Sequence, residues 1–147
     1  MQERFSNFTV LMAKITRSIK RIKTEEMEEY DLKSNHLSCL YYLHKMDTLT
    51  LAELVDISKE DKSILSKSVD DLYSKGLIER DDNLNYRNLL TLTPRGAEIA
   101  TQISAKIDNI LDAVSVGVTE KNRLIMYQCL SQISKNLDNY SKKIKED

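Results

Sequence analysis

Apolar residues recur at three- and four-residue steps along both ends of the chain. Near the N-terminus they are Phe5, Phe8, Leu11, Met12, Ile15, Ile19 and Ile22. Near the C-terminus they are Met126, Leu130, Ile133, Leu137, Tyr140 and Ile144. These steps place apolar side chains on one helical face, so we predict amphipathic helices over about residues 5–29 and from Glu120 onward. Another helix is predicted from Thr93-Pro94, where threonine caps and proline fits the first turn, and Gly117 is expected to end it.

Shorter elements are predicted in the middle of the chain. A helix over 34–46 is expected, with Ser34 as its N-cap. Thr50 with Glu53 matches a capping box, and Ser58 with Asp61 nearly repeats it, so two helix starts follow each other across a tight turn. The second of these helices is expected over about residues 60–75, where glycine at position 76 can adopt the left-handed conformation that ends a helix.

Two short apolar runs follow that helix. They are Leu77–Arg80 and Leu89–Leu92, with the turn-rich segment Asp81–Asn85 between them, so we predict a β-hairpin. A helix-turn-helix closed by a β-hairpin is a winged helix-turn-helix, whose usual target is duplex DNA. The predicted fold class is mainly α with a small β-wing. We expect one domain over 1–147, with a winged helix-turn-helix core at about 33–96 and dimerisation helices at about 5–29 and 94–145.

Composition agrees with a mainly helical protein. Of 147 residues, 41% are hydrophobic and 31% are charged, while only three are glycine and one is proline. We find no apolar run of about 18 residues and no cleavable signal pattern, so no membrane partner is expected. The two cysteines, Cys39 and Cys129, form no disulfide framework, which favours a reducing, cytoplasmic location.

The apolar stripes of the terminal helices are too long for one small domain to cover. We therefore predict a homodimer in which the terminal helices interleave. The residues expected in that interface are Phe8, Ile15, Leu130, Ile133, Leu137 and Tyr140. The alternative is that these helices pack against each other within one chain. A dimer would present two recognition helices to successive major grooves, about 34 Å apart on a pseudo-palindromic operator.

The helix at about residues 60–75 is the candidate recognition helix. The side chains predicted to contact DNA from it are Lys59, Lys62, Ser63, Ser66 and Lys67, because lysine and serine can pair with base edges in the major groove. In the hairpin, Arg87 is expected to enter an A·T-rich minor groove, with Asn85 beside it. The alternatives are a solvated surface for the lysines, and for Arg87 an ion pair with Asp81 or Asp82.

Residues 50–96 resemble a known family. The run Asp61–Lys67, followed by Leu72, Lys75–Arg80, Leu90–Thr93 and Gly96, is similar to the MarR family of bacterial transcription regulators. The resemblance implies an obligate homodimer, a recognition helix at about 60–75 and a wing at about 80–90. Most members of the family repress genes. Many release DNA when a small, often aromatic ligand binds near the junction of the dimer and DNA-binding regions.

A ligand pocket is predicted beneath Tyr41, Tyr42 and His44, against Met12 and Ile15 of the first helix. The alternative is that the tyrosine pair belongs to the core and its rim. A metal site is not expected. His36 and Cys39 share a helical face, but His44 is rotated from that face by roughly 80°, and a zinc site would need further ligands from elsewhere. Peroxide-sensing members of the family carry a reactive cysteine near the start of the first helix, and this chain has none there.

The predicted function is a sequence-specific DNA-binding transcriptional regulator, a homodimeric repressor that a small aromatic effector relieves. The second hypothesis is a winged-helix protein-interaction module without DNA binding. Two features motivate it: residues 32–96 hold nine basic against ten acidic residues, and Asn85 stands where the family commonly has aspartate. An enzyme is not expected, since the sequence has no P-loop, glycine-rich dinucleotide turn or nucleophile elbow, and no cofactor is predicted.

Overall fold

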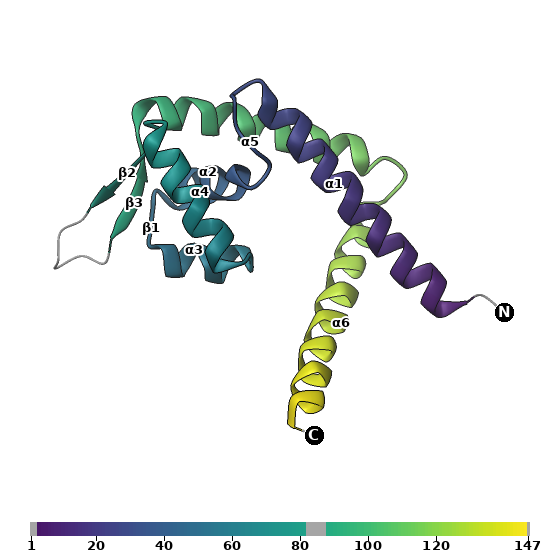
Figure 1. The fold of residues 1–147 in the computed structure, drawn as a ribbon. Coiled ribbons are helices and arrows are strands. Elements are labelled where there is room, and N and C mark those ends of the chain that lie inside the picture. The colour runs from purple at the N-terminus through teal and green to yellow at the C-terminus, as the bar shows by residue number, and fades with distance from the viewer. Residues whose placement is uncertain (1–2, 82–87, 147) are drawn as a thin grey trace. The chain divides into compact units, whose positions relative to one another are not determined.

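A computed structural model of the chain describes residues 3–81 and 88–146 (Figure 1). These residues fall into two compact units, one ending at Lys106 and one beginning at Ile107. The helix α5 (Pro94–Val114) runs from the first unit into the second. The described residues are mostly helical and include one three-stranded antiparallel sheet. The predicted fold class, mainly α with a small β-wing, is confirmed.

The N-terminal helix lies close to its predicted bounds but begins irregularly. A short π-helix, η1 (Ser6–Val10), leads without a break into α1 (Leu11–Glu28). The last turn of α1 is held to α5, because Lys106 Nζ lies 3.4 Å from Glu26 Oε2. Met27 is the one residue that α1 buries. Met27 is not part of the predicted apolar stripe, whose residues are exposed or half-buried within the described chain.

Three helices form the body of the winged unit: α2 (His36–Met46), α3 (Leu51–Ser58) and α4 (Lys62–Ser74). They lie together in Figure 1 beside the small sheet. Their inward faces supply a leucine-rich core. Its fully buried members include Leu40, Leu43, Leu54, Leu65 and Leu72. The spacing of these leucines follows from the apolar periodicity of each helix, so the sequence specifies which face of each helix is buried.

The predicted N-cap at Ser34 is wrong. The residue that precedes α2 is Asn35, and its side chain makes no capping hydrogen bond. The turn is held instead by the buried His36, whose Nδ1 accepts a hydrogen bond from the Lys33 N–H at 2.9 Å. A ring nitrogen inside the core thus fixes the turn that leads into α2.

The predicted cap at Thr50 is confirmed in part. Its hydroxyl oxygen accepts a hydrogen bond from the Glu53 N–H at 3.1 Å. The Glu53 carboxylate accepts from the Thr50 hydroxyl at 3.0 Å, in place of the Thr50 backbone amide that a full capping box would use.

The sheet has three strands in the order β1-β3-β2. Its members are β1 (Thr48–Leu49), β2 (Ile78–Asp81) and β3 (Leu89–Leu92). The predicted hairpin strands are confirmed, with Ile78 opposite Leu92 and Asp81 opposite Leu89. β1 was missed because two residues are too few to show an alternating pattern. It pairs with β3 and so ties the α2–α3 junction to the base of the wing.

Two glycines join α4 to the wing and to α5. Gly76 has φ +74°, the left-handed conformation that was predicted. The Gly76 N–H donates to Tyr73 O and the Leu77 N–H donates to Leu72 O, both at 3.0 Å, which closes a Schellman motif. Gly96 is needed for space, because a Cβ there would lie 1.9 Å from the carbonyl oxygen of Leu77. The first turn of α5 therefore packs directly on the backbone that leads into β2.

The second unit contains the end of α5 and the long helix α6 (Glu120–Glu146). As predicted, Gly117 lies in the break between the two helices, with φ +86°. The hydroxyl oxygen of Thr119 then accepts a hydrogen bond from the Asn122 N–H at 3.2 Å and caps α6. α6 is 27 residues long and buries none of them. Within residues 3–81 and 88–146, no helix has the length and apolar character needed to cross a membrane.

Candidate functional site

The helix α4 is fixed by its buried face and by its N-cap. Its buried residues are Leu65, Ser68, Val69 and Leu72. At its start, Asp61 Oδ1 accepts hydrogen bonds from the Ser63 N–H at 2.9 Å and the Ile64 N–H at 3.1 Å. The Ser63 hydroxyl also donates to this oxygen, and together with the Ile64 N–H it lowers the pKa of Asp61. The outward face of α4 is thus held rigidly at its N-terminal end.

The predicted helix start at Ser58 is wrong. Ser58 is the last residue of α3, and Lys59 follows it in the left-handed conformation with φ 57°. α4 begins at Lys62 because Asp61 is the residue whose side chain reaches two free amides. The start of α4 therefore carries a carboxylate.

Four of the predicted contact residues lie on α4. Lys62, Ser63 and Lys67 are exposed, and Ser66 is half-buried. Residues three or four apart are neighbours on a helix surface, so Ser63 and Lys67 form one adjacent pair and Lys62 and Ser66 another. Lys59 lies outside α4, in the turn before it, where its Nζ is 3.1 Å from Asp56 Oδ1. The structure thus brings four predicted residues onto one helix and places the fifth in the preceding turn.

A contact between β2 and α4 was missed by sequence reasoning. The Arg80 guanidinium forms an ion pair with Asp70 and lies 4.7 Å above the ring of Tyr73. Among the described residues, its buried Nε has no hydrogen-bond partner. The two charges are ten residues apart, a spacing that indicates nothing until the turn at Gly76 is known. This contact joins the first strand of the wing to the outward side of α4.

One family model matches part of the chain. Residues 32–87, from the start of α2 into the wing, match the family model described as MarR family. Over these residues the chain is similar to the MarR family. No curated protein matches the chain.

Solved structures match over nearly the whole chain. A MarR-family transcriptional regulator from Listeria monocytogenes, complexed with 26mer DNA, has a TM-score of 0.80 at 21% identity and covers 100% of this chain and 97% of its own. A MarR protein from Peptoclostridium difficile has a TM-score of 0.81 at 21% identity, with coverage of 98% and 97%. The S. aureus MepR–DNA complex has a TM-score of 0.79 at 19% identity, with coverage of 92% and 99%. At these identities the likeness shows the fold.

The two remaining predicted DNA contacts fall in the sequence between β2 and β3. Asn85 and Arg87 lie outside the described residues, as does Asp82, one of the proposed ion-pair partners of Arg87. Their roles stay predictions.

The predicted effector residues lie on two helices of the first unit. Tyr41 and Tyr42 are half-buried on α2, with ring centroids 5.3 Å apart and an interplanar angle of 82°. His44, on the same helix, is also half-buried. On α1, Met12 is half-buried and Ile15 is exposed. A pocket between these residues stays a prediction.

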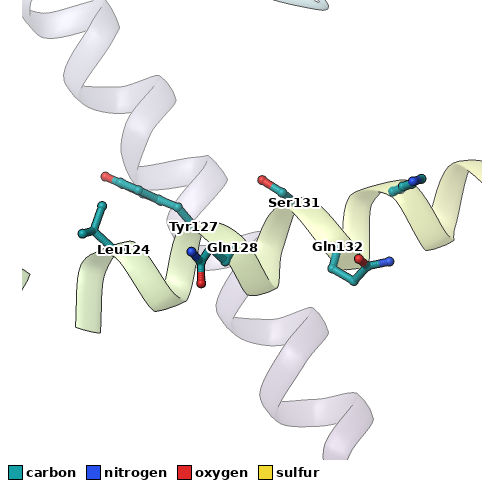
Figure 2. Close-up of a pocket in the computed structure, with 6 residues that line it drawn as sticks. Leu124, Tyr127, Gln128, Ser131 and Gln132 are labelled. Carbon is teal, nitrogen blue, oxygen red and sulfur yellow. The ribbon is translucent and has the colours of Figure 1, made fainter. Parts of the chain in front are cut away.

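An open hollow of about 470 Å³ lies along α6 (Figure 2). Its lining residues are Leu124, Tyr127, Gln128, Ser131, Gln132 and Lys135. At about 100° per residue, this set is centred opposite the apolar seam that includes Leu130 and Leu137. α6 therefore has two distinct faces, and none of the predicted effector residues lines the hollow.

The side chains of His36 and Cys39, both on α2, lie in the core. The Nδ1 of His36 accepts from the Lys33 N–H, which leaves the Nε2 proton to point at Asp71 Oδ2, 3.2 Å away. Cys39 is fully buried, and burial, with a smaller contribution from Glu60, raises the pKa of its thiol to about 12. Cys39 is therefore a protonated core thiol. Within residues 3–81 and 88–146, no cluster of three or more His, Cys, Asp or Glu side chains could hold a metal.

The predicted dimerisation residues are poorly covered in the single chain. The exposed ones are Phe8 at 39%, Ile15 at 49%, Ile133 at 36%, Leu137 at 57% and Tyr140 at 65% of their surface. Leu130 is half-buried. These values fit the expectation that a further surface covers the terminal helices.

Proposed function

We propose that this protein is a sequence-specific DNA-binding transcriptional regulator, a homodimeric repressor that a small-molecule effector relieves. The observation that carries the proposal is the division of α4 into two faces. One face is packed into the core and capped, and the other presents Lys62, Ser63 and Lys67 to solvent. A rigid helix with donors on its outward face is the element that reads base edges in a helix-turn-helix.

The dimensions of α4 support this reading. Its 13 residues span about 20 Å, and a major groove about 12 Å wide accepts a helix. When a recognition helix lies in the major groove, its N-terminal residues contact the bases. The residues proposed to contact base edges are therefore Lys62, Ser63, Ser66 and Lys67. Lys59 contacts phosphate from the turn before α4. Arg87 enters the minor groove from the wing, with Asn85 beside it.

The comparisons add independent support. The MarR-family match covers the elements that would meet DNA, and two of the similar solved structures are DNA complexes. The homodimer is supported by the exposed apolar seam of α6 and by the exposed apolar residues of η1 and α1. Relief by a small aromatic effector rests on the family resemblance and on the tyrosine pair of α2.

The competing function is a winged-helix module that binds protein and not DNA. Its specific support is the acidity around the proposed interface, because Asp61 caps α4 and Asp70 lies on its outward side. The Asp70 carboxylate is paired with Arg80, which reduces its repulsion of phosphate and favours DNA.

A salt series separates the two functions. We expect the affinity for a duplex selected from a random library to fall steeply as salt rises, because phosphate contacts release counterions. Lys67→Ala should weaken binding to the selected duplex, while Lys121→Ala, an exposed lysine of α6, should not. Arg87→Ala should weaken binding and reduce the A·T preference at the flanks of the site. A library that yields no enriched sequence would support the interaction module.

A further inference from the structure

Ile64 is exposed on α4 but is not among the residues proposed above to contact DNA. The two large apolar side chains exposed on this helix, which is described throughout, are Ile64 at 49% and Tyr73 at 50% of their surface. Tyr73 lies under the Arg80 guanidinium, which accounts for its place on the surface. The outward half of Ile64 has no comparable role in the fold. It was missed in the sequence because it precedes Leu65 and so lies off the apolar stripe of the helix.

The backbone holds Ile64 in a fixed direction. Its N–H donates to the Asp61 carboxylate at 3.1 Å, and its carbonyl oxygen accepts from the Ser68 hydroxyl at 2.9 Å. Ser68 is fully buried and accepts from the Asn35 side chain, so this anchor belongs to the core. An isoleucine in a helix also has one strongly preferred χ1 rotamer. The exposed part of Ile64 is therefore a stiff apolar surface that loses little entropy on contact.

The place of Ile64 in the helix points to a base. It lies in the first turn of α4, the part of a recognition helix that contacts base edges. It also lies three residues before Lys67, so the two side chains are neighbours on the helix surface. The one apolar group on the major-groove edge of the bases is the 5-methyl group of thymine. The neighbours of Ile64 can donate hydrogen bonds, and Ile64 offers the complementary apolar contact.

We propose that Ile64 reads the 5-methyl group of a thymine in each half-site, within one or two base pairs of the position that Lys67 contacts. The inference rests on the proposed DNA-binding function and assigns a specificity role to a residue outside the polar set. Burying one methyl group is worth about fourfold in affinity.

The test removes that methyl group and changes nothing else in the base pair. A duplex selected from a random library is synthesised with each thymine in turn replaced by deoxyuridine, and binding is measured by fluorescence anisotropy. We expect the wild-type protein to lose about fourfold affinity at one thymine per half-site. Ile64→Ala should bind the thymine duplex and the deoxyuridine duplex equally. Ile64→Val, which keeps the branched side chain, should retain most of the preference for thymine.

Controls keep the result specific. Alanine favours helix more than isoleucine does, so Ile64→Ala should leave α4 folded, as circular dichroism can confirm. Ile57→Ala removes a matched exposed isoleucine from α3 and should preserve the preference for thymine. Equal wild-type binding at every replaced position, or an unchanged preference in Ile64→Ala, would overturn the role of Ile64 while leaving DNA binding intact. Failure of the library to enrich any sequence would overturn both proposals.

Discussion

The helices α4 and α6 are both amphipathic, yet they differ in how much of their apolar surface the chain itself covers. α4 has 13 residues and buries four of them. α6 has 27 residues and buries none. Periodicity alone identifies the apolar face of each helix, but it does not identify the surface that covers that face. The winged unit is completed by its own sequence, whereas the seam of α6 is left for a surface outside the described chain, in our proposal a second copy.

The largest effect should come from adding a side chain at Gly96, where α5 packs directly on the backbone before β2. Gly96→Ala would place a Cβ 1.9 Å from the Leu77 carbonyl oxygen, so the backbone must move. We expect a loss of more than about 4 kcal/mol in the free energy of unfolding, measured by urea denaturation. Gly117→Ala is the control, since φ +86° strains it but its Cβ meets nothing within 4 Å, and should cost about 1 kcal/mol. Equal costs would contradict the close packing of α5 on the wing.

A smaller effect is expected from charging the seam of α6. Leu137→Asp places a carboxylate where the proposed dimer has an apolar contact, and should weaken association by at least about 100-fold. Multi-angle light scattering across a dilution series measures this. Asn139→Asp adds the same charge on roughly the opposite face and should remain dimeric. If Leu137→Asp also remains dimeric, the seam of α6 does not form the dimer interface. The proposal that a second copy covers α6 would then be wrong.

The link between the wing and α4 should contribute still less. Asp70 is 64% exposed and Arg80 is 27% exposed at the side chain, so solvent screens their attraction. A double-mutant cycle with Arg80→Ala and Asp70→Ala should give a coupling of about 0.5–1 kcal/mol in the free energy of unfolding. The Lys59–Asp56 pair, exposed by 79% and 81%, should give less. A coupling no larger than that of this control pair would remove Arg80 as a structural link.

The smallest effect concerns the cap of α4. Hydrogen bonds from the Ser63 hydroxyl and the Ile64 N–H lower the pKa of Asp61 below its ordinary value of 3.8. A carboxylate with a lowered folded pKa stabilises the protein above its unfolded pKa, and this contribution is lost as pH falls through the folded value. Thermal melts between about pH 6 and 3 should therefore show a shallower acid dependence in Asp61→Asn than in the wild type. Parallel curves would mean that the carboxylate is not held by these bonds.

The sequence was sufficient for features that depend on local pattern. The order of the helices, the hairpin, the turn at Gly76 and the break at Gly117 follow from periodicity and backbone preference, and the structure confirms them. It was insufficient where distant residues decide the outcome. The cap expected at Ser34 is not formed, and the buried ring of His36 fixes the turn before α2. The strand β1 exists only because β3 pairs with it.

In the candidate site, too, some features follow from the local sequence pattern and others depend on distant residues. Lys62, Ser63 and Lys67 follow from helical spacing and are exposed on α4. The Arg80–Asp70 pair depends on a contact between separate segments, which no short-range pattern encodes. The anchor of Ile64 depends in part on another such contact, because the Asn35 side chain donates to the Ser68 hydroxyl. Acidic and basic residues are nearly equal in number across the winged unit, so their placement decides what the surface can bind.

The most direct test of the account is fluorescence anisotropy with the DNA immediately upstream of the protein's own gene, compared with a scrambled duplex of the same composition, at low and moderate salt. An autoregulating sequence-reader predicts tight binding to the native duplex, weak binding to the scrambled one, and a difference that persists as salt rises. Equal affinity for both duplexes at every salt concentration would contradict sequence recognition at this site.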